Sequence, residues 1–205
     1  MTWKRFIVWD NNQEDFLRQF CPNSTYIKVG YLDITGISKN FYSDKKFKIL
    51  SVFDITPLRT TAHTRLGMAI PQYITEELNI KFLEDIKEVC KNSNWKICWK
   101  PKREVGNHFV SKKILKKQSD LLDDSLIKIF SGIAASSLVE KSDAVISMPF
   151  SSPSVIAKFK NIPCIFYDSL GLLENSRRRG IPLLKGKQEL KDWFEILNRE
   201  LNSKN

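Results

Sequence analysis

The clearest indication of the fold is the segment Ser142-Asp-Ala-Val-Ile-Ser-Met-Pro-Phe-Ser-Ser-Pro-Ser-Val-Ile-Ala-Lys-Phe-Lys-Asn-Ile-Pro-Cys-Ile-Phe-Tyr-Asp168. Ala144 to Met148 is a short and mostly apolar run, which is typical of a buried parallel strand. Ser151 or Ser152 is suited to cap a helix, and Pro153 fits its first position, where a missing N–H costs nothing. The next strand is expected from Cys164 to Tyr167. The segment therefore predicts a strand–helix–strand unit of a parallel sheet.

The turn between the first strand and the helix has two interpretations. Ser151 and Ser152 lie at a helix start that follows the carboxyl end of a parallel strand, where amides and hydroxyls are placed to bind phosphate. Alternatively, the two serines only cap the helix. The sequence leaves both interpretations open, and we take Ser151 and Ser152 as candidate phosphate-binding residues.

The same turn carries a family resemblance. Pro149-Phe150-Ser151-Ser152 resembles the Pro-Phe-Thr-Ser motif of the PFTS polysaccharide biosynthesis proteins, with serine in place of threonine. Phe6-Ile-Val-Trp-Asp10 and Tyr26-Ile-Lys-Val-Gly30 are also similar to that family. Its members are regarded as surface-carbohydrate glycosyltransferases of the GT-B type. The resemblance therefore implies the nucleotide-sugar-binding C-terminal half of such an enzyme.

Strand and helix patterns alternate through most of the remaining chain. Hydrophobic strands are expected at residues 47–53 and 95–99, and amphipathic helices at 74–91 and 187–201. This alternation predicts an α/β fold over residues 47–205, a Rossmann-like doubly wound parallel sheet.

The N-terminal segment is expected to fold apart from that sheet. Short strand, helix and strand patterns up to residue 31 predict a βαβ-like fragment, and the polar residues 33–46 predict a linker. We take residues 1–40 as the tail of an acceptor-side domain or as an N-terminal extension.

Two further polar clusters are expected to follow strands of the sheet. Lys100, Lys102 and Arg103 come directly after a strand and are suited to bind a diphosphate or a sugar carboxylate, although a solvated basic turn explains them equally well. Ser136 and Ser137 near a helix start are candidates for contact with a nucleobase or ribose, and helix capping is the alternative.

The loop after residues 47–53 contains the candidates for proton transfer. His63 and Asp54 are weak candidates for a catalytic base, since a single histidine in a loop is more often only exposed to solvent. The sequence does not assign the catalytic residue. The candidate substrate-binding residues are Arg59, Arg65, Tyr167 and Asp168.

Composition constrains the partners. Lys and Arg exceed Asp and Glu by 33 to 23, a net charge of +10, which favours an anionic partner but also occurs in lysine-rich proteins with no such partner. The basic residues are spread along the chain and no RRM, KH or helix-turn-helix pattern is present, so we expect no nucleic-acid partner and keep a basic nucleic-acid-binding module only as an alternative. Arg177-Arg178-Arg179 is interpreted either as a contact for membrane headgroups or as a solvated loop.

Neither a metal nor a cofactor is expected. Two histidines cannot by themselves form a zinc site, and the chain contains neither a GxGxxG nor a GxxxxGK[ST] pattern. Four scattered cysteines without a CxxC pair favour free thiols in a reducing compartment. We therefore expect the protein in the cytoplasm, including the inner face of the membrane.

These observations lead to one functional interpretation. We expect the donor-binding half of a glycosyltransferase that transfers a sugar from a nucleotide sugar to a surface glycan. The resemblance also implies a donor in which the sugar is linked to cytidine monophosphate (CMP). Because a complete two-domain enzyme needs about twice this length, we expect the chain to be a fragment, a split protein or a degenerate form, with a partner chain as one source of the acceptor domain. The alternative is a non-catalytic subunit that binds the nucleotide sugar.

Overall fold

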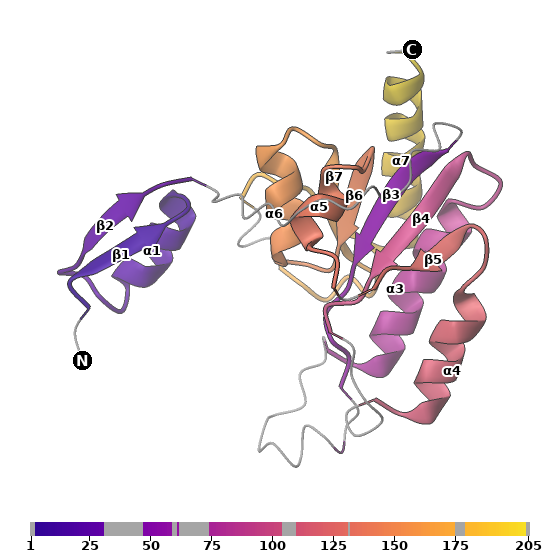
Figure 1. Ribbon diagram of the computed structural model, residues 1–205, viewed down its shortest axis with the longest axis horizontal. Helices are drawn as coiled ribbons and strands as arrows, with labels where there is room; N and C mark the ends of the chain where they lie inside the picture. Colours follow the sequence, from indigo (N-terminus) through magenta and orange to yellow (C-terminus); the bar gives the residue numbers. More distant parts are fainter. Residues whose placement is uncertain are drawn as a thin grey trace. The chain divides into compact units, whose positions relative to one another are not determined.

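The computed structural model describes residues 3–30, 47–58, 61, 74–103, 110–130, 132–174 and 179–203. The chain divides into two compact units, Met1–Gly36 and Ile37–Asn205. Each unit has its own sheet (Figure 1).

The first unit is a βαβ fragment, as the sequence predicts. β1 (Arg5–Val8) and β2 (Thr25–Lys28) pair in parallel, and α1 (Asn11–Arg18) connects them. A reciprocal cap starts this helix: the Asp10 carboxylate accepts a hydrogen bond from the Gln13 amide at 2.8 Å, and the Gln13 side chain accepts one from the Trp9 amide at 2.8 Å. Whether this unit belongs to an acceptor-side domain stays a prediction.

The second unit is built on a six-stranded parallel sheet. Its strands lie in the order β5-β4-β3-β6-β7-β8. The strands are β3 (Lys48–Phe53), β4 (Trp95–Lys100), β5 (Leu126–Lys128), β6 (Ala144–Ser147), β7 (Cys164–Asp168) and β8 (Leu183–Lys185). The chain proceeds outward from β3 to β5 and then returns to build β6 to β8 on the other side of β3. This order confirms the predicted Rossmann-like doubly wound sheet and places its topological switch point between β3 and β6.

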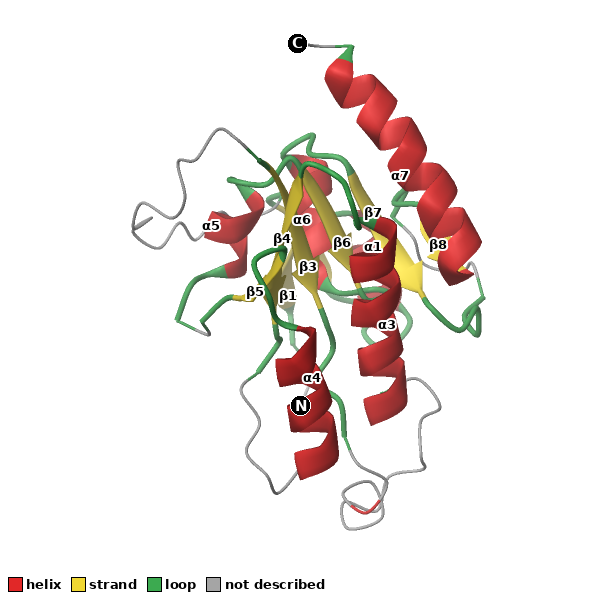
Figure 2. Cartoon of the chain, turned by 90° about the vertical axis from the view of Figure 1, so that its right-hand side faces the viewer, coloured by secondary structure: helices red, strands yellow, loops and turns green. Residues whose placement is uncertain are grey.

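Helices cover both faces of the sheet (Figures 1 and 2). One face carries α3 (Glu76–Val89), α4 (Lys112–Leu121) and α7 (Gly186–Asn202), and the other carries α5 (Ala135–Val139) and α6 (Ser152–Phe159). Alternate strand residues such as Val52, Trp99 and Tyr167 belong to the main core with α3 and α7. Phe166 is the neighbour of Tyr167 in β7 and faces the opposite side of the sheet, where it packs with Val155 of α6 in a separate cluster.

Two local details differ from the sequence expectation. Helix α6 begins at Ser152, so Pro153 takes its second position and not its first. The strand β8 was not expected at all: it has three residues, it follows a proline, and it continues directly into α7. A strand this short has too few residues to show an alternating pattern, and it forms because Phe166 to Asp168 of β7 offer it a ladder to pair with.

Candidate functional site

The carboxyl ends of the six parallel strands lie at one edge of the sheet, and most predicted site residues follow them. Asp54 comes after β3, Lys100 ends β4, the Pro149–Ser152 turn follows β6, and Asp168 ends β7. Ligands of doubly wound sheets bind outside this edge, next to the switch point. The β3–β6 pairing brings Asp54 and the Pro149–Ser152 turn to that point.

Asp54 is the centre of a buried hydrogen-bond network. Its Oδ2 accepts hydrogen bonds from Asn79 Nδ2 at 3.0 Å and from Trp99 Nε1 at 3.1 Å, and its Oδ1 accepts one from the Lys102 amide at 2.7 Å. Burial raises the pKa of the Asp54 carboxyl from its ordinary 3.8 to about 6, against the lowering effect of these donors. The network therefore connects the ends of β3 and β4 to α3 through one carboxylate.

The network extends to α4 through residues that the sequence did not indicate. Asn79 Oδ1 accepts a hydrogen bond from Gln118 Nε2 at 2.7 Å. Asn79 is buried in α3, and Gln118 is on α4. Both residues occur inside amphipathic helix patterns, where a polar residue is normally assigned to the solvent face, so no sequence pattern distinguishes them.

A pocket of about 290 Å³ opens beside Asp54. Its polar lining is Asp54, Arg103, Gln118 and Lys128, and proline, aliphatic and tryptophan side chains form the remainder. Lys128 Nζ lies 5.9 Å from the centre of the Trp99 ring. Of the predicted basic cluster, Arg103 faces this pocket, Lys102 contributes its amide to Asp54, and the half-buried Lys100 is the last residue of β4.

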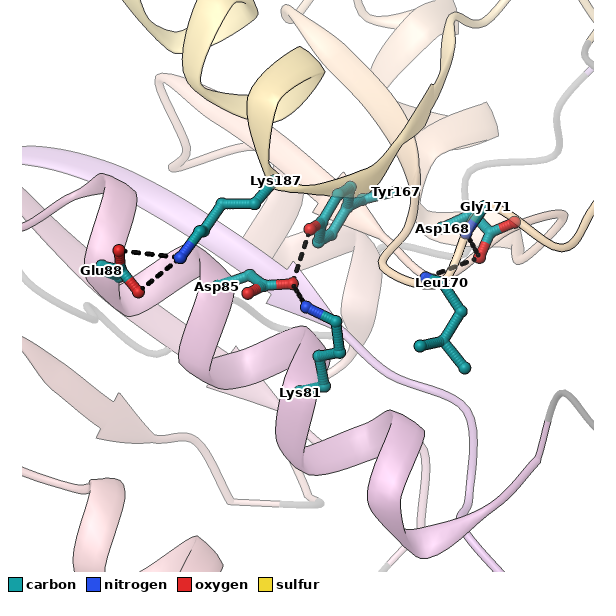
Figure 3. Close-up of polar contacts among 8 residues, drawn as sticks. All are labelled: Lys81, Asp85, Glu88, Tyr167, Asp168, Leu170, Gly171 and Lys187. Atoms are coloured by element: carbon teal, nitrogen blue, oxygen red, sulfur yellow. Dashed lines mark hydrogen bonds and ion pairs between the residues drawn. The ribbon is translucent and has the colours of Figure 1, made fainter.

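The end of β7 is an internally bonded turn (Figure 3). The Asp168 side chain is completely buried, and its carboxylate accepts hydrogen bonds from the amides of Leu170 at 3.2 Å, Gly171 at 3.0 Å and Leu173 at 2.8 Å. This arrangement fixes the loop that follows β7. The expected role of Asp168 in substrate binding stays a prediction, and this placement does not favour it.

Tyr167 points into the core on the other side of the strand. Its hydroxyl donates a hydrogen bond to Asp85 Oδ2 on α3 at 2.8 Å, and Lys81 Nζ lies 2.7 Å from the same oxygen (Figure 3). Burial, followed by the neighbouring Asp85, raises the pKa of Tyr167 far above its usual range. A direct contact between Tyr167 and substrate is not favoured by this position and stays a prediction.

The remaining predicted residues have less defined positions. Ser136 is buried and Ser137 is half-buried in the first turn of α5, whose start has no side-chain cap. Arg59, His63 and Arg65 lie outside the described residues. Within the described ranges, no three His, Cys, Asp or Glu side chains are grouped to hold a metal ion, and all four cysteines are unpaired.

Two buried hydroxyls at this edge have no hydrogen-bond partner among the described residues. They are Thr56 Oγ1, in the loop after β3, and Ser169 Oγ, directly after β7. Buried hydroxyl groups are nearly always hydrogen-bonded in native proteins. A water molecule or a bound ligand would satisfy them, and both follow strands on opposite sides of β6 in the sheet order.

A family model described as Polysaccharide biosynthesis PFTS motif protein matches residues 1–194. The chain belongs to this family. The resemblance based on Pro149–Ser152 is thereby confirmed. No curated protein sequence matches the chain. In the part of the chain that the structure describes, no helix is long and apolar enough to cross a membrane.

Three solved structures are similar to this PFTS motif protein. A protein from Listeria monocytogenes assigned as a UDP-N-acetylglucosamine 2-epimerase has a TM-score of 0.50 and 10% identity, and the match covers 80% of this chain and 41% of that one. The C-terminal domain of a glycosyl transferase group 1 family protein from Francisella tularensis has a TM-score of 0.46 and 17% identity over 76% of this chain and 79% of that domain. The glycotransferase of kitacinnamycin has a TM-score of 0.47 and 10% identity over 87% of this chain and 46% of that one. The first of these likenesses shows the fold, and the chain covers less than half of the Listeria and kitacinnamycin proteins.

The PFTS motif itself forms the turn into α6. Phe150 has a positive φ of 63°, in the left-handed region, which costs a non-glycine residue about 1–3 kcal/mol. Its ring meets Phe166 edge-on, with 5.6 Å between ring centres, and this contact helps to hold the unusual conformation. Ser151 is the N-cap residue, but its hydroxyl donates to the Met148 carbonyl at 2.8 Å, so no side chain caps the first amides of α6.

The buried serines Ser147 and Ser154 hold the motif against the sheet. Ser154 Oγ donates a hydrogen bond to the Ile165 carbonyl of β7 at 2.9 Å and shares another with Ser147 Oγ of β6 at 2.6 Å. These bonds fix the first turn of α6 against both strands. The predicted phosphate site at Ser151 and Ser152 stays a prediction, with open amides and not serine hydroxyls as its main donors.

Proposed function

We propose that this PFTS motif protein is the donor-binding part of a GT-B-type glycosyltransferase that transfers a sugar from a nucleotide sugar during surface polysaccharide biosynthesis. The family membership and the Rossmann-like fold support the transferase role. A CMP-linked donor and a cytoplasmic position at the inner face of the membrane belong to the same proposal. The acceptor would be held by a second domain, because the larger unit of this chain is one Rossmann-like domain.

The observation that carries the proposal is the α6 N-terminus at the switch point. The Ser152 and Ser154 amides lie in the first turn of α6, where no side chain caps them. A helix N-terminus with open amides stabilises negative charge, because the partial charges of the peptide units sum there. The phosphates of a donor bound across β3 and β6 would accept these hydrogen bonds.

The chemistry follows from the leaving group. When the bond from sugar to nucleotide breaks, negative charge collects on the departing phosphate. Fixed amide dipoles and nearby cations lower the barrier, because they need no reorganisation at the moment of reaction. Asp54 fits a positioning role better than that of a base, since both of its oxygens already accept hydrogen bonds and it is 3% exposed.

A pair of variants at the exposed Ser152 tests the donor site. Ser152→Glu places a carboxylate at the helix start, which favours the helix and competes with phosphate for the same amides. Ser152→Gln has nearly the same size without the charge. Binding of CMP, UDP and their sugar derivatives would be measured by thermal shift, in which a specific ligand raises stability with its concentration.

We expect the wild type and Ser152→Gln to be stabilised by at least one of these nucleotides, and Ser152→Glu to show at least a tenfold weaker affinity. Equal nucleotide affinities of the Glu and Gln variants would show that the phosphate does not bind at the α6 N-terminus. If no nucleotide stabilises the wild type, the donor role itself is wrong.

A further inference from the structure

The pocket beside Asp54 has more positive charge than its surroundings neutralise. Arg103 and Lys128 both line it, and among the described residues neither forms an ion pair with a carboxylate. Among the described lining residues the one carboxylate is Asp54, and its two oxygens already accept three hydrogen bonds. The hydrogen-bonding groups left for a ligand are therefore mostly cationic donors.

The geometry separates this pocket from the α6 N-terminus. Arg103 follows β4 and Lys128 ends β5, whereas α6 follows β6. Strand β3 lies between β4 and β6. Neighbouring strands are about 4.8 Å apart, so the ends of β4 and β6 are about 10 Å apart. A phosphate held at α6 would leave this pocket empty.

Size and wall chemistry limit the ligand. A volume of about 290 Å³ lies at the lower limit for small-molecule pockets, which suits a single ring better than a whole nucleotide sugar. Pro57, Pro101 and Leu115 form apolar walls. A guanidinium fork and an ammonium group together match the oxygens of one carboxylate or phosphate.

We propose that the pocket between Arg103 and Lys128 binds a small organic anion, a carboxylate or phosphate group carried on a single sugar ring. The choice of a sugar rests on the proposed function, whereas the choice of an anion rests on the pocket alone. Asp54 acts here as a positioning residue, because it fixes the Lys102 amide and the Trp99 ring that shape the pocket.

Calorimetric titration of the full chain at constant ionic strength tests the proposal with three probes: glucuronate, glucose 1-phosphate and glucose. The first two carry a carboxylate and a phosphate, and the third is neutral. The variants are Arg103→Gln, Lys128→Gln and, as a control with the same charge change, Lys191→Gln on the exposed face of α7. All three residues are exposed, so the variants should fold, which their melting temperatures would verify.

We expect at least one anion to bind and glucose not to bind. Each pocket variant should weaken the bound anion about tenfold, in line with a charged hydrogen bond, and the control should leave it unchanged. The stronger of the two anions identifies the group. Failure of both anions to bind at 10 mM or so, or an equal loss in Lys191→Gln, would overturn the proposal.

The Ser152 variants keep this result separate from the donor proposal. Ser152→Glu should leave anion binding in the pocket unchanged even if it abolishes nucleotide binding. Loss of both in Ser152→Glu would assign the anion to the α6 N-terminus and overturn the pocket assignment. If anions bind and no nucleotide does, the proposed anion pocket is supported and the proposed donor-binding role is wrong.

Discussion

Replacing Asp54 with asparagine should reveal the buried charge as a change in the pH dependence of folding. In the folded protein, burial raises the pKa of Asp54 to about 6, from its ordinary 3.8. The native state therefore binds a proton more tightly than the unfolded chain does. The resulting stabilisation is complete below pH 3.8 and is lost as the pH rises through 6.

The magnitude follows from these two values. The full difference corresponds to about 3 kcal/mol, since one pKa unit is worth about 1.4 kcal/mol. Between pH 7.5 and pH 5, the wild type should gain about 1.4 kcal/mol in free energy of unfolding relative to Asp54→Asn. Asparagine keeps only one acceptor oxygen, so the variant loses the acceptor either for Asn79 and Trp99 or for the Lys102 amide, but that cost is nearly the same at both pH values.

Urea unfolding of both proteins at pH 5 and pH 7.5, followed by circular dichroism, gives the difference directly. Other titrating groups are common to both proteins and cancel. If the stability difference between wild type and Asp54→Asn is the same at both pH values, the carboxyl has no raised pKa and our account of the network is wrong. A relative gain for the wild type at the higher pH would show that the hydrogen-bond donors outweigh burial.

Three further predictions concern the supports of the site. Tyr167→Phe should lower the free energy of unfolding by about 1–3 kcal/mol, because Asp85 loses a buried donor; an unchanged midpoint in urea would contradict the bond. Ser154→Ala should cost a similar amount because the Ser147 hydroxyl and the Ile165 carbonyl each lose a buried hydrogen bond, whereas Ser152→Ala on the exposed start of the same helix should cost little. Gly180→Ala should lower the melting temperature, since a φ of +71° is strained for any residue with a Cβ, while Gly132→Ala, which has no such φ and has open space at its Cβ, should not.

The sequence predicts the fold well because the fold depends on local patterns. Each long strand is mostly apolar, and each long helix has one apolar face, so the alternation that defines a doubly wound sheet is visible without any tertiary information. The three-residue strands β5 and β8 are too short for such a pattern, and β8 is a strand only by pairing with β7. Tertiary contact decides such a segment, and local pattern does not.

The site was predictable only at the level of the sheet edge. Parallel strands place their carboxyl ends together, so Asp54, Arg103 and Ser152 could be assigned to one edge from the strand pattern alone. The partners of these residues could not. Gln118 forms a hydrogen bond with Asn79, which is 39 residues away in the sequence. Tyr167 differs from a ligand-binding residue only because its side chain faces α3 and not the edge of the sheet.

The spacing between the two candidate anion sites limits the ligand that can fill both. About 10 Å separates the strand ends that hold them, so one phosphate group seated on the α6 amides does not also fill the pocket. A single ligand must carry two anionic groups, such as a nucleotide phosphate and an acidic sugar. Two separate ligands should bind with little interference, because like charges 10 Å apart in water repel by only about 0.4 kcal/mol. Saturating CMP should therefore weaken glucuronate binding about twofold in a calorimetric titration. Strict competition between them would mean that both anions use one site, and that the separation of the pocket from α6 has no functional meaning.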